Sequence, residues 1–362
     1  MSKNDSCPAK KTSIGGQALI EGIMMRGPKM TAMAVRNPKG EMVLEKWETQ
    51  TTAKAKIFKL PIIRGVFGFI DSMRFGYKCL MRSAEISGLE DLEEEARIEK
   101  ARKKAEKEAK KRGEEFDAEA FTDAAKAEQA ENAEKKSSSA LTSIIMVLGV
   151  VLGVALALTL FVALPTFLFN WTSSRLTFLT PDNAALASLY KSVFEGVLKI
   201  VLLVGYMSLV SLMKDIRRTF QYHGAEHKTI FCYEHGQELT VENVKREGRF
   251  HPRCGTSFLI LMLLVSIFIS FFIDPIAIAI TGDVLHVAIR IVVKILLLPI
   301  IMGLGYELIK LAGRHDNLFT RIISAPGVWL QHLTVFEPTD DMIECAIAAF
   351  VEVIPEDASD NY

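Results

Sequence analysis

The sequence predicts a mainly α-helical membrane protein: a four-span helical bundle with a small N-terminal cytoplasmic α+β unit and a cytoplasmic metal-capable loop. Three observations support this class. The 362-residue chain has a mean hydropathy of +0.22, although 24% of its residues are charged. Its apolar residues gather in four long segments separated by polar chain. Four of its seven histidines and two of its five cysteines lie at positions 223–254, between the second and third segments.

Residues 1–56 are expected to form the N-terminal β-containing unit, with a disordered polar tail to about residue 12. Residues 31–36 and 41–48 have strand-like composition, and the turn Asn37-Pro38-Lys39-Gly40 between them predicts a hairpin. The preceding stretch GGQALIEGIMMRGP lacks the GK[ST] ending of a phosphate-binding loop. Its glycines are therefore expected to permit tight turns or close packing.

Two helical segments are expected before the first span. Residues 57–88 predict an amphipathic interfacial helix, because Arg74, Lys78 and Arg82 form a basic stripe beside a face of large apolar residues. Packing of this helix on the β unit is the open alternative. Residues 89–136 are dominated by Glu, Lys and Ala and offer almost no apolar stripe, so they predict a charged, solvated helix or spacer.

Residues 137–313 are expected to form the four-span membrane domain. Its apolar segments are 141–169, 189–213, 258–273 (continuing past Asp274-Pro275) and 284–311, and each is long enough, or nearly so, to cross the hydrocarbon core. Some carry charges, such as Lys191, Glu195 and Lys199 in the second span. They could pair along one helix face, as Arg290 and Lys294 could with an acid elsewhere, and so line a polar path through the bundle. Because several of these charges lie toward the ends of their spans, we expect them instead to snorkel to the membrane surface.

The distribution of basic residues predicts the orientation. The first and third connections contain one basic residue between them, Arg175. The second connection, loop 214–257, contains eight: Lys214, Arg217, Arg218, Lys228, Lys245, Arg246, Arg249 and Arg253. Basic loops stay on the cytoplasmic side. We therefore expect a multi-pass protein of the cell membrane with loop 214–257, both termini and the C-terminal segment 314–362 in the cytoplasm, and residues 343–353 packed as a helix on the soluble unit.

The motif HGAEH places His223, Glu226 and His227 on one face of a helix. The order H-x-x-E-H matches the inverzincin pattern, in which two histidines bind zinc and the glutamate handles the proton of the attacking water. In this hypothesis His251 or Cys254 completes the ligand set. Glu307, about eighty residues further on, offers another ligand, or else pairs with Lys310.

A structural metal site is the competing hypothesis. Cys232-x-x-His235 and His251-x-x-Cys254 have the spacing of a zinc ribbon with mixed ligands, which would close a tetrahedral site. The third reading is that these are ordinary polar residues at an interface, bonded to backbone.

Seven segments together resemble the bacterial YqhQ-like family, an integral-membrane domain of unknown function that is sometimes labelled a predicted metal-dependent enzyme. They are GGQALIEGIMMRGP, LPIIRGVFGFIDSM, YHGAEHKTI, LTVENV, HPRCGTSFLI, GYELIKLA and APGVWLQHLT. The resemblance implies that His223, Glu226, His227, His251 and Cys254 belong to the shared pattern. Cys232 and His235 do not, which favours the open site over the closed one.

Three functions remain open from the sequence. The first is a metal-dependent hydrolase at the cytoplasmic membrane surface, with a divalent metal such as zinc on His223, His227, His251 and Cys254 and with Glu226 as the general base. The second is a non-enzymatic membrane scaffold or biogenesis factor, with a structural metal and a cytoplasmic protein or ribosomal partner. The third is an ion or solute transporter that uses the charges within the spans. Zero net charge gives no support to bulk nucleic-acid binding.

Overall fold

The computed structural model describes residues 10–49, 60–112, 117–118, 120–124, 139–315, 317–357 and 359–360. Most of the expected polar tail, the junction at 50–59 and much of the expected spacer at 113–138 lie outside these residues. The chain divides into two compact units, Gly88–Ala163 and the remainder, Met1–Ser87 with Leu164–Tyr362. The first of these contains the charged helix α2 (Leu89–Arg112), then α4 (Ser139–Leu158) and the π-helical turn η2 (Thr159–Ala163).

The N-terminal unit is a four-stranded antiparallel sheet in the order β1-β2-β3-β4. Its strands are β1 (Gly15–Leu19), β2 (Gly22–Arg26), β3 (Met30–Arg36) and β4 (Met42–Glu48). The predicted hairpin is confirmed as β3 and β4, with Gly40 at a φ of 82° in the turn, a conformation that glycine adopts without strain. The Gly-rich stretch before it forms the hairpin of β1 and β2.

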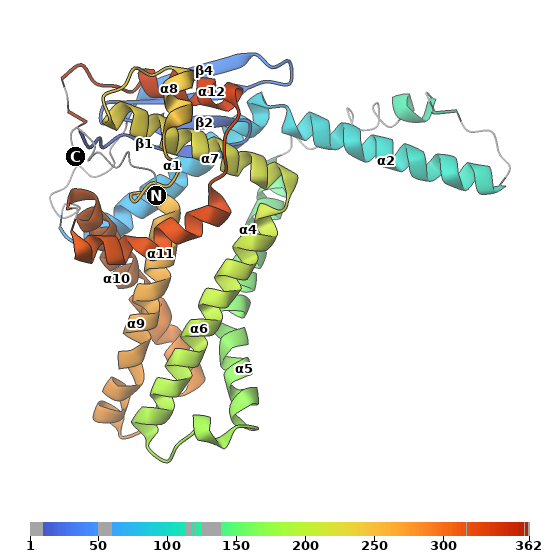
Figure 1. Cartoon of the computed structure of the whole chain (residues 1–362). Helices are drawn as coiled ribbons and strands as arrows, with labels where there is room; N and C mark the ends of the chain where they lie inside the picture. Colours follow the sequence, from blue (N-terminus) through green and yellow to red (C-terminus); the bar gives the residue numbers. More distant parts are fainter. Residues whose placement is uncertain are drawn as a thin grey trace. The chain divides into compact units, whose positions relative to one another are not determined.

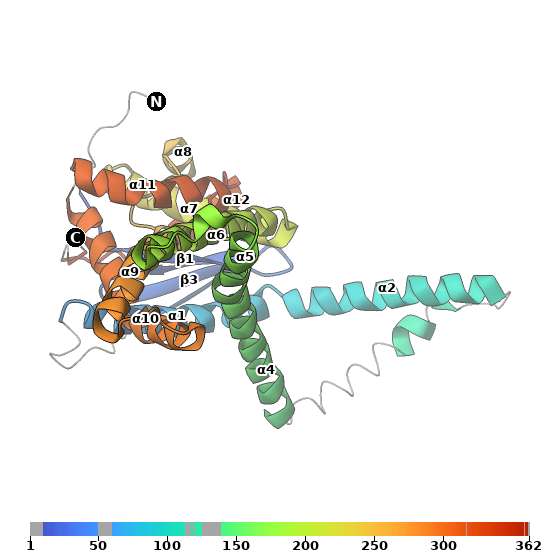
Figure 2. The ribbon, with the colours of Figure 1, turned by 90° about the horizontal axis from the view of Figure 1, so that it is seen from below.

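Helices cover both faces of this sheet (Figure 2). On one face lie α7 (Lys214–Glu234), the short α8 (Val241–Arg246) and α12 (Asp340–Val351), and they share a core with Ile23, Met25 and Ala34. On the other face, α1 (Ile63–Ile86) buries Cys79 against Met24 and Met33. The predicted helix at 343–353 is therefore confirmed as α12. Helix α1 packs on the β unit, as one alternative expected, and also exposes Ile70, Met73 and Tyr77.

Four helices are long and apolar enough to cross a membrane, which indicates a membrane protein and matches the four predicted spans. They cover Leu148–Ser173, Leu186–Ser211, Gly255–Thr281 and Ala288–Arg314. The first ends in α5 (Leu164–Ser173), which a short 3-10 turn, η3 (Thr177–Leu179), separates from α6. The others are α6 (Ala184–Ser211), α9 (Gly255–Thr281) and α10 (Val287–Arg314), and α9 packs against both of its neighbours.

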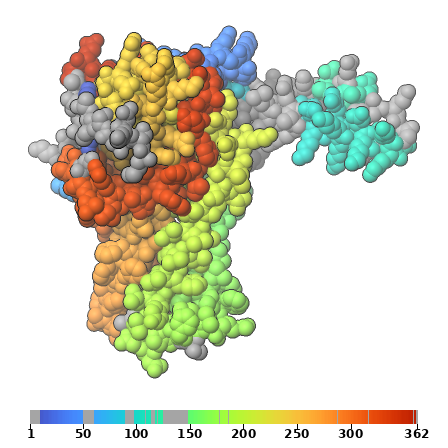
Figure 3. Space-filling model, viewed as in Figure 1, coloured from blue at the N-terminus to red at the C-terminus, as the bar shows by residue number. Residues whose placement is uncertain are grey.

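The sheet, α7, α8 and α12 lie at one end of α6, α9 and α10 (Figure 1). Helix α11 (Leu318–Thr334) leaves the end of α10 and runs across that end of the spans. The space-filling view in Figure 3 shows α11 as an orange-red band between the spans and the sheet unit. The long loop between the second and third spans thus folds onto the N-terminal sheet rather than standing alone.

Two expectations are wrong. Residues 10–12 are not a free tail, because Lys10 and Thr12 both bond to the buried carboxylate of Asp360. The charges of the spans do not simply snorkel: Glu195, Lys199, Asp274 and Arg290 are all buried. Asp274 pairs with Arg290, and Lys294 lies 3.3 Å from Glu195. Sequence positions near the ends of a span did not reveal that these side chains face other helices.

Candidate metal centre

Two histidines of α7 and one cysteine form a compact group. His223 and His227 lie one turn apart on the same face of the helix, and Cys254 comes from the start of α9. One ligand atom from each of the three lies within 4.8 Å of the others. His223 Nε2 lies 3.0 Å from Cys254 Sγ. The structure therefore brings together three of the four predicted ligands, from two helices.

Each imidazole is oriented by a backbone carbonyl. The Nδ1 of His223 donates to the carbonyl oxygen of Thr334 at 3.0 Å, and the Nδ1 of His227 donates to that of Arg249 at 2.6 Å. A carbonyl oxygen can only accept, so the proton of each neutral ring is placed on Nδ1. In the neutral form of each ring, which is the form that binds a metal, Nε2 then carries the lone pair. This outer contact is typical of metal-binding histidines.

Cys254 is poised as a thiolate. Its Sγ is the N-cap acceptor of α9, where it accepts a hydrogen bond from the backbone N–H of Thr256, and helix N-termini stabilise negative charge. Burial raises the pKa of this thiol, but the neighbouring His223 and His227 outweigh burial and hold the pKa well below its usual value. Conversely, burial lowers the pKa of His223, yet the charge of Cys254 raises it to about 9.

Glu226 is buried beside the group and is held by the N-terminal strand. Its Oε1 accepts a hydrogen bond from the backbone N–H of Gly16 at 2.9 Å. Burial raises the pKa of this carboxyl, in opposition to His223 and His227. A cavity of about 170 Å³ adjoins Glu226, His227 and Cys254, and residues 12–16 of the N-terminal segment line its other side. Open space therefore adjoins two of the candidate ligands, His227 and Cys254, and the carboxyl of Glu226.

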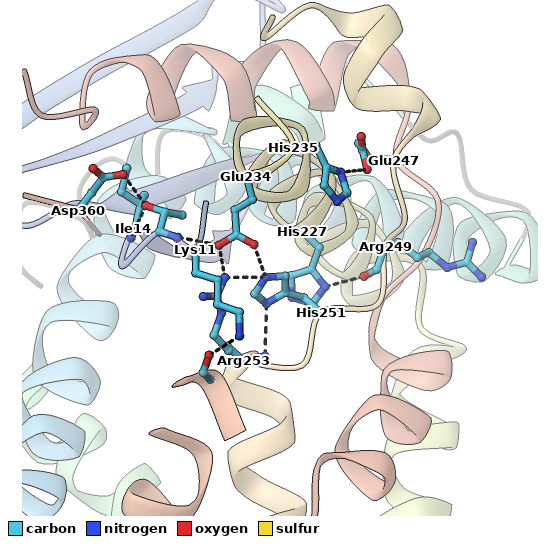
Figure 4. Close-up of polar contacts among 12 residues, drawn as sticks. Lys11, Ile14, His227, Glu234, His235, Glu247, Arg249, His251, Arg253 and Asp360 are labelled. Atoms are coloured by element: carbon cyan, nitrogen blue, oxygen red, sulfur yellow. Dashed lines mark hydrogen bonds and ion pairs between the residues drawn. The ribbon is translucent and has the colours of Figure 1, made fainter. Parts of the chain in front are cut away.

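His251 stands outside the group, although it was among the expected ligands. Its Nδ1 accepts the backbone N–H of Arg253 at 3.3 Å, and its Nε2 lies 3.8 Å from the carboxylate of Glu234 (Figure 4). Burial lowers the pKa of His251 to about 4, against the effect of Glu234. With both ring nitrogens engaged, the imidazole supports the wall of the cavity instead of facing the other ligands. Of the two residues proposed to complete the set, the geometry selects Cys254.

The zinc-ribbon alternative does not assemble within the described residues. The Sγ of Cys232 contacts the carbonyl oxygen of Glu238, and His235 Nδ1 bonds to Glu247 at 2.9 Å. Neither belongs to the three-residue group. Glu307, the other expected candidate, pairs instead with Arg64 of α1 through both carboxylate oxygens.

Three supporting residues were not found from the sequence. Gln331 of α11 is fully buried, accepts the N–H of His251 and donates to its carbonyl oxygen, so it holds the HPRC segment in place. Gly224 lets the backbone of Phe336 approach α7. Gly16 holds Glu226. For Gly16 the sequence predicted a tight turn or close packing but not the contact with Glu226, and nothing pointed to Gly224 or Gln331.

The donor set fits a zinc-like ion. Two imidazoles and a thiolate are borderline-soft ligands that suit zinc, and zinc bond lengths place tetrahedral ligand atoms about 3.3–3.6 Å apart. The three ligand atoms lie within 4.8 Å of one another, which is wider than that range, so the side chains would have to close around a bound ion. Three protein ligands with an adjoining cavity correspond to the open coordination typical of catalytic sites, whereas structural sites close with four.

The fold and this group define the class: a membrane protein with a folded sheet unit at one end of its spans and a His-His-Cys group that could hold a metal. A family model described as "Protein of unknown function (DUF1385)" matches residues 60–356, so the chain belongs to that family. The chain is also similar to "Uncharacterized protein YqhQ" of Bacillus subtilis (strain 168), with 30% identity over 359 residues, 98% of this chain and 95% of that protein. The resemblance to the YqhQ-like family is thus confirmed. No solved structure matches the chain.

Proposed function

We propose that the protein is a metal-dependent hydrolase at the cytoplasmic face of the membrane. His223, His227 and Cys254 hold a divalent ion such as zinc, and Glu226 is the general base. The observation that carries the proposal is the cavity that adjoins Glu226, His227 and Cys254 at once. A structural site has no need of an open position or of an unligated buried carboxylate beside it.

In this mechanism the chain's own residues position the reaction. A zinc ion held by His223, His227 and Cys254 would supply Lewis acidity to the reaction. The backbone N–H of Gly16 holds Glu226 Oε1, which keeps the carboxylate at the cavity. Glu226 takes the proton of the attacking water and delivers it to the leaving group. The carbonyl oxygens of Thr334 and Arg249 accept hydrogen bonds from the two imidazoles and so fix the orientation of both rings.

A non-enzymatic scaffold with a structural metal is the second candidate. One observation favours it: the His-His-Cys group connects α7, which packs on the sheet, with Cys254, the N-cap residue of the span α9. An ion at that position would fasten the sheet unit to the membrane domain. Under this candidate, Glu226 would have no chemical role.

Metal analysis of the purified full-length protein tests the site. We expect about one zinc-like ion per chain, and a loss of affinity of more than about 100-fold for Cys254→Ser and His223→Ala, because loss of an outer partner alone costs about 10–100-fold. His235→Ala is the matched control, since His235 lies at the end of the same helix and bonds to Glu247. An absence of stoichiometric metal in the unaltered protein would overturn both candidates.

Glu226→Gln separates the two candidates. For a hydrolase, the variant keeps its metal but behaves like a deletion when it is returned to cells that lack the protein. If Glu226→Gln restores the wild-type phenotype in full, the hydrolase is ruled out and the structural role stands.

A further inference from the structure

A second and larger cavity, of about 380 Å³, lies beside the candidate metal centre. It shares His251 and Arg253 with the smaller cavity. Its volume is within the range of small-molecule sites, about 300–1,000 Å³. The end of α10 and one side of α11 line it, together with Lys11, Phe231 and Pro252.

Helix α11 presents three distinct faces. Arg321, Ser324, Ala325 and Val328 follow the i, i+3, i+4, i+7 spacing and line the cavity. Leu318, Phe319, Ile322 and Trp329 lie on the neighbouring face and are more than half exposed. Thr320, Gly327, Gln331 and Thr334 are buried. Large apolar side chains, with a tryptophan among them, are typical of a helix that lies in the membrane surface.

The cavity lies at the end of a candidate membrane span, where we expect the lipid headgroups to be. Ala312, Gly313 and His315, at the end of the span Ala288–Arg314, line it directly. Helix α11, which forms another wall, starts three residues later, at Leu318. A ligand in this cavity can reach the bilayer without crossing the sheet unit.

The lining combines positive charge with apolar surface. Lys11, Arg253 and Arg321 contribute cationic groups, and the carboxylate among the lining residues, Glu234, is buried and paired with Arg253. Phe231, Ala325 and Val328 supply apolar walls. The Nζ of Lys11 reaches the end of the span, where it donates to the carbonyl oxygen of Gly313 at 2.9 Å. Cationic groups of this kind recognise a phosphate, and apolar walls recognise the carbons attached to it.

We propose that this cavity binds the anionic headgroup of a membrane phospholipid, with its phosphate near Lys11 and Arg321 and its first carbons along Ala325 and Val328. The site is independent of the metal and of hydrolysis. Free phosphate shares the charge of such a ligand but lacks its acyl chains, and the experiment below distinguishes the two.

The test uses the full-length protein in a neutral detergent, with phosphatidylglycerol, phosphatidylcholine and inorganic phosphate as separate probes. Native mass spectrometry measures retained lipid, and the thermal unfolding midpoint measures stabilisation. We expect phosphatidylglycerol to bind and raise the midpoint, phosphatidylcholine to bind about tenfold more weakly, and phosphate to give no shift at the same concentration. If phosphate alone binds as tightly as phosphatidylglycerol, the lipid assignment is overturned.

Two variants address the cavity itself. Arg321→Gln should weaken phosphatidylglycerol binding about tenfold, the effect of one lost charge-assisted hydrogen bond. Val328→Trp should abolish lipid retention by filling the apolar part. The matched control is Arg314→Gln, since Arg314 is exposed at the same end of α10 but does not line the cavity. Unchanged binding in both cavity variants would refute the site, and Glu226→Gln should bind lipid normally whatever the fate of the hydrolase.

Discussion

Gly224, at the centre of HGAEH, shows how a single residue fixes the candidate metal centre. A Cβ at this position would lie 2.0 Å from the carbonyl oxygen of Phe336. The close approach lets the segment after α11 run along α7, where Phe336 N–H donates to Phe220 and Thr334 accepts from His223. The glycine is thus needed for packing, which in turn orients an imidazole.

We expect Gly224→Ala to destabilise the protein by about 1–3 kcal/mol, because the added methyl has to push α7 and the Phe336 backbone apart. Metal content should fall with it, since His223 loses its carbonyl partner. Gly68→Ala is the control: Gly68 lies in α1 with open space around it, and alanine there should be neutral or stabilising by up to about 1 kcal/mol. Thermal unfolding and metal analysis of both variants check the prediction. Equal behaviour of the two alanines would contradict it.

Asp360 also acts as a single buried anchor. It bonds to Lys10 at 2.9 Å, Thr12 at 2.8 Å and Tyr233 at 3.0 Å. Burial raises the pKa of this carboxyl, but the hydrogen bonds from these three residues outweigh burial and lower the pKa overall. The carboxylate therefore fastens the N-terminal segment, which lines the cavity of the metal centre, to the C-terminal residues.

The sign of the shift sets the pH dependence. A lowered pKa in the folded state means that the stabilisation is fully present above the unfolded value of about 4 and is lost as the pH falls through the folded value. We expect Asp360→Asn to lower the free energy of unfolding by about 1–3 kcal/mol at neutral pH and by less below about pH 4. Asp357→Asn, which removes an exposed pair with Lys29, should change little. A difference between Asp360→Asn and wild type that grows as the pH falls below 4 would contradict the assignment.

Among the elements, the sequence predicted those whose signal is local. The β3–β4 hairpin has a turn of Asn, Pro, Lys and Gly, and each span has its own apolar run. The partners of charged residues within the spans were not predictable, because they depend on which helix faces which. Asp274 of α9 meets Arg290 of α10 and accepts a hydrogen bond from Ser188 of α6 at 2.5 Å.

The Asp274–Arg290 pair should couple α9 to α10. Removal of one partner leaves a buried charge without compensation, at a cost of about 3–5 kcal/mol. We therefore expect Asp274→Ala to unfold at a much lower temperature in detergent, and the double variant Asp274→Ala/Arg290→Leu to recover much of the loss. Unfolding of the two single variants and the double variant gives the coupling energy. Simple additivity of the single effects would show that the two residues do not interact.

At the scale of the whole molecule, the candidate site combines parts that only the fold brings together. The sequence predicted His223, Glu226, His227 and Cys254 as site residues, because HGAEH and HPRC are short and chemically distinctive. Gly16 and Gln331 lie 210 and 80 residues from the groups that they hold, Glu226 and His251. No short-range spacing reveals a contact over such separations. The exclusion of His251 likewise depends on Glu234 and Arg253, which compete for its nitrogens.

Because the sheet unit lies at one end of the spans, the side of the membrane on which it stands can be tested. The basic loop between the second and third spans carries α7 and α8, which pack on the N-terminal sheet unit. We therefore expect the whole assembly, with the candidate metal centre, to lie on one side of the membrane. The positive-inside rule predicts that this side is the cytoplasm.

Cysteine labelling of intact cells with a membrane-impermeant maleimide tests this orientation. The described native cysteines, Cys79, Cys232, Cys254 and Cys345, are all buried, so a Cys7→Ser background should react weakly. In that background we expect Ser174→Cys and Asp283→Cys, in the first and third connections, to be labelled from outside. Lys214→Cys, at the start of the basic loop, should be labelled only after the cells are opened. The reverse pattern would place the candidate metal centre and the lipid cavity on the outer face of the membrane. That result would contradict the proposal of a hydrolase at the cytoplasmic face.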